Sequence, residues 1–105
     1  MLKPVLFHPA ADAEANAAWQ WYQERSETAS SRFFSELAVA IENIQTHPLR
    51  YPLYPGVLDY EVRYRSLKRF PYAVVFEILN DRIHVLAVAH VRRRPAYWQE
   101  RGGRG

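Results

Sequence analysis

The sequence of 105 residues contains no cysteine. A disulfide framework, a thiolate zinc site and a cysteine nucleophile are therefore all excluded. The four histidines, His8, His47, His84 and His90, are scattered along the chain without the spacing of a zinc site. We predict no metal and no cofactor.

Long apolar runs are also lacking. No stretch approaches the roughly 18 consecutive apolar residues that a membrane-spanning helix needs. Residues 1–7 (MLKPVLF) lack the extended apolar segment and the small-residue cleavage site of a secretory signal. The sequence predicts a cytoplasmic protein with no membrane partner.

The composition is that of an ordinary globular domain, because hydrophobic residues make up 49% of the chain and charged residues 24%. A chain of this length has room for one modest core. We expect one domain over residues 1–98 and a flexible tail over residues 99–105, where glycine is too frequent for regular structure.

Charge is distributed unevenly along the chain. Residues 1–61 carry four Lys and Arg against eight Asp and Glu, whereas residues 62–105 carry ten against three. The second part predicts a cationic surface for an anionic partner, and its tyrosines and tryptophan suit phosphate binding with base stacking. A solvated basic surface without a ligand is the alternative.

Residue periodicity predicts one strand and two helices in the first half. Residues 5–7 indicate a short strand that ends before Pro9, and residues 10–25 repeat small and aromatic residues at helical spacing. Ser26 or Thr28 is expected to cap a second helix, which ends at Pro48. The short link between the helices predicts an antiparallel hairpin.

The second half switches to the two-residue period of strands. Residues 60–65 alternate, with Tyr64 on one face and Arg63 and Arg65 on the other. Residues 72–79 are almost wholly apolar, as in a central strand buried on both faces, and a turn at residues 80–81 leads into a last strand.

The predicted fold class is α+β. An N-terminal strand and a two-helix antiparallel hairpin pack on a small antiparallel sheet in the order β-α-α-β-β-β. The side chains expected in the core are Trp21, Phe33, Leu37, Ile41, Val74, Phe76, Val85 and Ala87. Trp19 falls off the buried stripe, so it is either partly exposed or part of a contact surface.

Three segments resemble the RelE/ParE superfamily of toxins from bacterial toxin–antitoxin pairs. They are residues 32–37 (RFFSEL), 69–78 (RFPYAVVFEI) and 85–98 (VLAVAHVRRRPAYW). The likeness extends over about residues 3–98. It implies a type II toxin that arrests growth, of the kind associated with plasmid stabilisation, and a cognate antitoxin protein that forms a hetero-oligomer with it.

One branch of this superfamily consists of ribosome-dependent mRNA interferases. Such metal-independent cleavage needs a proton acceptor, a cation for the phosphoryl oxygens and a donor for the leaving oxygen. The resemblance offers as catalytic candidates Arg63, Arg65, Arg92, His90 and Tyr97.

The chain departs from that branch at two positions. Ala73 stands where the interferases tend to place an arginine, and Trp98 stands where a C-terminal tyrosine would be, with Tyr97 one residue early. His90 can transfer protons near neutral pH, yet a structural hydrogen-bonding role is equally compatible with its place at a strand end.

The other branch resembles ParE-type poisons of DNA gyrase, which need a binding surface rather than a general base. The Phe-Pro-Tyr and Arg-Arg-x-Pro-x-Tyr-Trp strings are closer to this branch, which we favour. The residues expected to bind the target are Arg63, Arg65, Arg69, Arg92, Arg93, Arg94, Tyr97 and Trp98. A third reading, a non-toxic binding module on the same fold, stays open.

Overall fold

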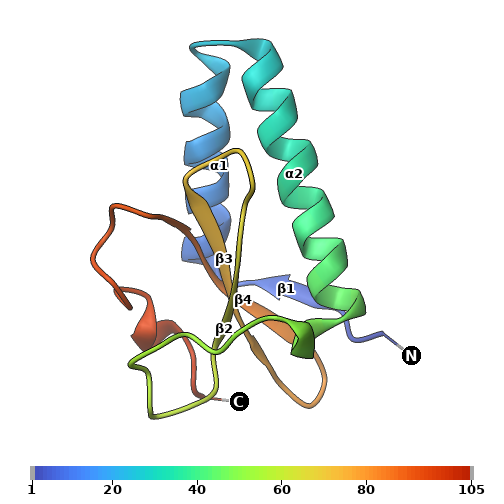
Figure 1. Cartoon of the computed structure of the whole chain (residues 1–105), viewed down its shortest axis with the longest axis vertical. Helices are drawn as coiled ribbons and strands as arrows, with labels where there is room; N and C mark the ends of the chain where they lie inside the picture. The colour runs from blue at the N-terminus through green and yellow to red at the C-terminus, as the bar shows by residue number, and fades with distance from the viewer. Residues whose placement is uncertain (1, 105) are drawn as a thin grey trace.

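Two helices stand on one face of a four-stranded sheet in the computed structural model of the chain, which describes residues 2–104 (Figure 1). The predicted order β-α-α-β-β-β is confirmed, with two additional short 3-10 turns. The elements are β1 (Val5–Phe7), α1 (Pro9–Gln23), α2 (Glu27–Thr46), η1 (Pro48–Arg50), β2 (Arg63–Ser66), β3 (Tyr72–Ile78), β4 (Ile83–His90) and η2 (Gln99–Arg101).

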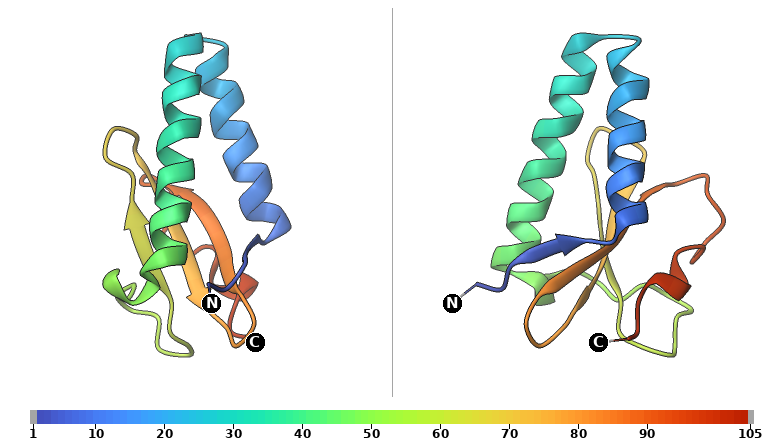
Figure 2. Two further views of the ribbon diagram at one scale, coloured as in Figure 1. Left: turned by 90° about the vertical axis from the view of Figure 1, so that its right-hand side faces the viewer. Right: turned by 180° about the vertical axis from the view of Figure 1, so that it is seen from behind.

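Both helices begin at side chains that accept a backbone hydrogen bond. His8 Nδ1 accepts from the Ala10 N–H at 3.0 Å, and Pro9 occupies the first turn of α1, where a missing N–H costs nothing. Ser26 Oγ accepts from the Ala29 N–H at 3.2 Å, which confirms Ser26 as the cap of α2. The link between the end of α1 at Gln23 and the beginning of α2 at Glu27 is short, so the two helices are antiparallel neighbours (Figure 2).

The sheet has the strand order β1-β4-β3-β2, and it is mixed rather than wholly antiparallel. β3 pairs antiparallel with β2 and β4, but β1 pairs parallel with β4, Val5 opposite Ile83 and Phe7 opposite Val85. The helical hairpin and two further strands separate β1 from β4 in sequence. β4 can therefore run in the same direction as β1, whereas two strands joined by a tight hairpin must be antiparallel.

The first core lies between the helices and the sheet. Ala11, Ala18 and Tyr22 form the stripe of α1 that faces this core, and the Tyr22 ring lies 5.5 Å from the Phe33 ring. Trp21 was expected in the core but is 50% exposed, because it lies beside this stripe rather than on it. Trp19 is 37% exposed, so it lies at the surface.

The remaining predicted core residues occupy three positions. Those buried in the first core are Phe33, Val74, Phe76 and Val85. Leu37 and Ile41 are partly buried against it, and Ala87 is buried on the opposite face of the sheet. β4 therefore contributes to both cores, and the pairing of β3 with β4 shifts register next to Val75 and Phe76.

The second core lies on the sheet face away from the helices. Its buried members are Val62, Val75, Leu86, Ala87 and Trp98. Tyrosines from the segment before β2 and the end of the chain after β4 pack against them. Because side chains of β3 are buried on both faces, the apolar run over residues 72–79 has the central-strand role that it predicted.

The glycine-rich end of the chain, expected to be a flexible tail, is packed against the domain through Gly103. The Tyr60 hydroxyl donates to the Gln99 carbonyl oxygen at 2.8 Å, and the Gly103 N–H donates to Glu77 Oε1 at 2.9 Å. Glycine permits this approach, because a Cβ on Gly103 would lie 2.6 Å from Tyr60 Cδ1. Gly105, also assigned to the tail, lies outside the described residues.

Candidate functional site

The segment after β4 turns back across the sheet and carries the basic string at residues 92–94. Trp98 anchors it: the side chain is 1% exposed and its ring lies 4.9 Å from the Tyr54 ring in an edge-to-face contact. Trp98 was expected at the target-binding surface, but the apolar second face of the sheet needs a cover, and the indole supplies it. In this structure Trp98 is a core residue.

A second anchor is Tyr97, which is held by Glu14 of α1. The Tyr97 hydroxyl donates to Glu14 Oε2 at 2.7 Å, and Arg101 Nη1 donates to Glu14 Oε1 at 3.1 Å. Burial, with the hydrogen bond and negative charge of Glu14, raises the pKa of Tyr97 well above its ordinary value. A phenol in this environment is a poor proton acceptor.

Glu14 also holds the sheet, because its Oε1 accepts the Val88 N–H at 3.1 Å. β1 pairs only with residues 83–85, so in the described part of the chain no strand lies beside residues 86–90 on that side of β4. Arg101 Nη1 donates to the Leu86 carbonyl oxygen at 3.0 Å on the same edge. The side chains of Glu14 and Arg101 thus replace a neighbouring strand there. In the sequence, Glu14 could have been noticed as a carboxylate among the apolar residues that repeat along the first helix.

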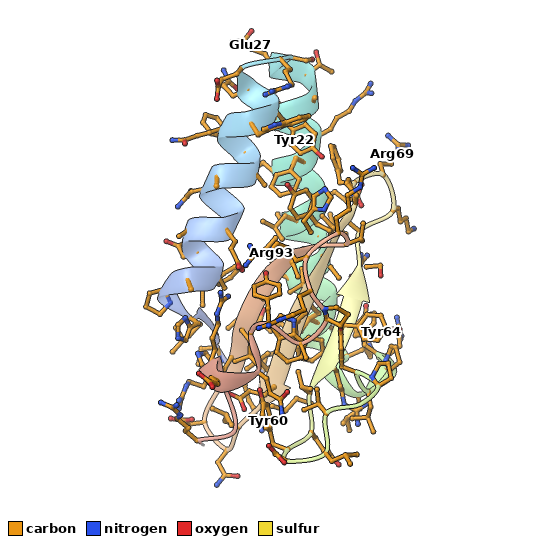
Figure 3. The ribbon with its side chains drawn as sticks, turned by 90° about the vertical axis from the view of Figure 1, so that its left-hand side faces the viewer. Tyr22, Glu27, Tyr60, Tyr64, Arg69 and Arg93 are labelled. Carbon is orange, nitrogen blue, oxygen red and sulfur yellow. The ribbon has the colours of Figure 1, made fainter. Side chains whose placement is uncertain are left out.

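The three arginines between these anchors and β4 are exposed, which avoids the high cost of burying guanidinium groups without partners. The Arg93 guanidinium lies 4.0 Å from the centre of the Tyr97 ring, a cation–π distance. Figure 3 shows Arg93 on this segment, at the level of the sheet. Tyr97 and Trp98 therefore hold the segment in place while Arg92, Arg93 and Arg94 face solvent.

His90 ends β4 and orders the turn that follows. Its Nδ1 accepts the Arg92 N–H at 3.1 Å, and its ring lies 5.0 Å from the Tyr72 ring in an edge-to-face contact. This arrangement gives His90 a structural part in presenting the basic string.

Arg63 and Arg65 lie on the other side of the sheet from the basic string. Arg63 is paired with Phe76 and Arg65 with Val74, so both share the face that the helices cover, as the predicted alternation requires. Arg63 Nη1 donates to the Tyr51 carbonyl oxygen at 2.6 Å, and its Nε is buried without a partner. The nuclease candidates consequently do not converge on one pocket.

Two of the hollows beside the basic segment are lined by both His90 and Arg93. The smaller, of about 220 Å³, lies over the second face of the sheet and includes Arg93, Arg94, His90, Tyr64 and Ala73 in its lining. The Ala73 methyl group lies where the resemblance implies an arginine in the interferases.

The larger hollow, of about 440 Å³, lies between α1 and the open edge of β4 and has Trp21, Tyr22 and Tyr72 among its lining residues. Arg93 and His90 line its other side. This hollow therefore combines aromatic walls with the Arg93 guanidinium, and the Glu14 carboxylate in its lining is engaged by Tyr97 and Arg101.

Arg69, the remaining predicted contact residue, lies on the turn between β2 and β3, at the end of the sheet where Tyr72 pairs with His90, and apart from Arg93 (Figure 3). Its backbone N–H donates to Glu36 of α2, so the turn is tied to the helix. No helix within residues 2–104 is long and apolar enough to cross a membrane.

Comparison with known proteins agrees with this fold. The family described as ParE toxin of type II toxin-antitoxin system, parDE, matches residues 5–95. No curated protein sequence matches the chain. A solved structure titled "Chromosomal ParDE TA system from P. aeruginosa" is similar with a TM-score of 0.71 and 16% identity, covering 85% of this chain and 96% of that chain. Since the family match spans most of the residues, the chain belongs to the ParE toxins of type II toxin–antitoxin systems.

Proposed function

We propose that this toxin arrests growth by poisoning DNA gyrase, and that residues 92–94 form the surface that contacts the target. One observation supports the proposal most directly: three exposed arginines lie on a segment whose position is fixed by Tyr97 and Trp98. A rigid cationic surface suits binding, because little conformational freedom is lost when the target engages it. Gyrase would be met in the cytoplasm.

The interferase activity is disfavoured by the placement of its candidate groups. Arg63 and Arg65 share the helix-covered face, and the Tyr97 hydroxyl donates to Glu14. One observation keeps that activity as the second candidate: His90, Arg93 and Arg94 line the same hollow over the second face of the sheet. An imidazole and two guanidiniums are suitable groups for phosphoryl chemistry.

The decisive experiment compares the products of the two activities. Purified toxin is incubated with gyrase, ATP and supercoiled plasmid, and separately with ribosomes translating a defined mRNA. We expect linear plasmid DNA covalently attached to gyrase and an intact mRNA. Cleaved mRNA with unchanged plasmid would establish the interferase, and neither product, together with normal growth on expression, would establish the non-toxic binding module.

The family is that of a toxin–antitoxin pair, so the partner of this chain is an antitoxin. The hollow beside β4 suits an acidic, amphipathic segment of that protein, added as a strand or a helix, because aromatic side chains and Arg93 line it. Trp21→Ala should weaken antitoxin binding at least tenfold in a titration, while Trp19→Ala, on the same helix but outside this hollow, should leave it within twofold. Equal affinities of the two variants would place the antitoxin elsewhere.

A further inference from the structure

Four cationic side chains from three parts of the chain meet at the turn between β2 and β3. Arg32 comes from α2, Arg65 from β2, and Lys68 and Arg69 from the turn itself. They line one open hollow of about 590 Å³, which we call the turn surface. Figure 3 shows Arg69 at this turn, apart from Arg93 of the C-terminal segment, and none of Arg92, Arg93 and Arg94 lines this hollow. The turn surface is thus distinct from the basic string.

Glu36 of α2 fixes this arrangement. Its carboxylate accepts hydrogen bonds from the backbone N–H groups of Lys68 and Arg69, the latter at 3.2 Å to Oε2. The one carboxylate in the hollow is therefore engaged by backbone donors rather than by the cationic side chains. Among residues 2–104, the recorded ion pairs include none of Arg32, Arg65, Lys68 and Arg69. Their charges are available to a ligand.

Hydroxyl groups line the same hollow. Thr28, Ser31 and Ser35 lie on one face of α2, three and four residues apart, and all three belong to the lining. Hydroxyls alongside guanidinium and ammonium groups are the side chains that most often contact phosphate oxygens in nucleic-acid complexes. The turn surface therefore has the donors that a row of phosphates would use.

Among residues 2–104, no aromatic residue lines the turn surface, and Val39 is its only hydrophobic lining residue. Proteins that bind single-stranded nucleic acid usually stack its bases on aromatic rings. A surface with cations and hydroxyls but no ring is better matched to the outside of a duplex, where only the phosphates and sugars are presented.

We propose that the turn surface binds the phosphate backbone of duplex DNA. The inference rests on the proposed function only for the source of that DNA, which would be the duplex held by gyrase. The toxin then has two contact regions: residues 92–94 for the gyrase target, and the turn surface for the adjoining DNA. Binding by the turn surface is independent of base sequence, because phosphates carry no sequence information.

The test uses the full chain and a fluorescent 20-bp DNA duplex without gyrase, with anisotropy measured over a series of salt concentrations. Lys68→Ala combined with Arg69→Ala should weaken binding by roughly eightfold per lost phosphate contact at 0.1 M salt and reduce the slope of log K against log salt by about 0.9 per contact. The matched control is Arg50→Ala combined with Arg104→Ala, which removes the same charge from exposed positions outside the turn surface. This control should retain most of the affinity.

A second variant tests the hydroxyls, which carry no charge. Ser31→Ala combined with Ser35→Ala should weaken binding by about threefold to tenfold, the effect of losing one or two hydrogen bonds, with an unchanged salt slope. Far-ultraviolet circular dichroism verifies that each variant keeps its fold.

Four results would overturn the proposal: unchanged DNA binding by the Lys68 and Arg69 variant, equal losses in variant and control, tighter binding of single-stranded RNA than of the duplex, or loss of antitoxin binding with DNA binding retained. Because gyrase is absent, the assay is separable from the proposed function. A toxin that binds the duplex through the turn surface but never traps cleaved plasmid would refute gyrase poisoning alone.

Discussion

The Tyr97 hydroxyl donates a 2.7 Å hydrogen bond to Glu14 Oε2, which joins the end of the chain to the first helix across 83 residues of sequence. Val88 and Arg101 donate to the other oxygen of the same carboxylate. One partly buried acidic side chain therefore connects α1, the open edge of β4 and the segment that carries the basic string. This connection makes Tyr97 a structural residue in our interpretation.

Tyr97→Phe separates the structural role of Tyr97 from a catalytic one. The variant loses a hydrogen bond to a charged acceptor, so the free energy of unfolding should fall by about 1.5–3 kcal/mol. The phenyl ring still lies beneath Arg93, so growth arrest should persist at a temperature where the variant is folded. Urea denaturation and a growth assay measure the two effects. Loss of toxicity with an unchanged free energy of unfolding would instead indicate an interferase that uses this hydroxyl in catalysis.

The tail contact makes stability sensitive to alkaline pH. Burial, followed by the carboxylates of Glu77 and Asp59, raises the pKa of Tyr60 to about 12 from an ordinary value of 10.0. The unfolded chain then releases this proton first, so the contribution of Tyr60 is complete below pH 10 and is lost as the pH rises towards 12. We expect the melting temperature of the wild type to fall more steeply between these pH values than that of Tyr60→Phe, whereas parallel curves would contradict this linkage.

Gly103→Ala tests whether the end of the chain contributes to the fold. Gly103 has a φ of 78°, and an added Cβ would lie 2.6 Å from Tyr60 Cδ1. The matched control is Gly56→Ala, because Gly56 has a φ of 85° but nothing within 4 Å of an added Cβ. Gly56→Ala should cost only the backbone strain of about 1–2 kcal/mol, and Gly103→Ala clearly more. Equal costs in thermal unfolding would mean that the end of the chain does not hold this position.

Phe76→Ala should destabilise the domain by about 3–5 kcal/mol, because the ring is fully buried at the centre of β3. Phe34→Ala is the control, since its side chain is 65% exposed on α2 and its removal leaves no cavity in the core. Chemical denaturation of both variants measures the difference. A small effect at Phe76 would show that the central strand is misplaced.

The strands and helices could be predicted from the sequence because their signals are local. Pro9 and Ser26 start helices through their own backbone and side-chain chemistry, and residues 72–79 mark a doubly buried strand by composition alone. The parallel pairing of β1 with β4 has no such local signal. It depends on contacts between residues nearly 80 positions apart.

The candidate site was harder to predict for the same reason. Alternation correctly placed Arg63 and Arg65 on one face, but only the tertiary fold shows that the helices cover that face. Trp98 follows a basic string and was expected to accompany it at the surface, yet it fills the second core. The structural roles of Glu14 and Lys68 depend on hydrogen-bond partners that are distant in sequence.

The basic string is expected to act in toxicity rather than in folding. Arg92→Ala combined with Arg93→Ala should abolish growth arrest while the free energy of unfolding changes by no more than about 1 kcal/mol, since both side chains are exposed and the Arg93 contact is a surface cation–π pair. Trp98 and the Tyr97 hydrogen bond remain in place, so the segment keeps its position without the charges. Growth on induction and urea denaturation measure the two effects, with Arg50→Ala as the exposed cation that should leave both unchanged. Loss of folding together with toxicity would make these arginines structural, whereas a folded variant that remains fully toxic would move the target-binding surface to Arg65 and Arg69.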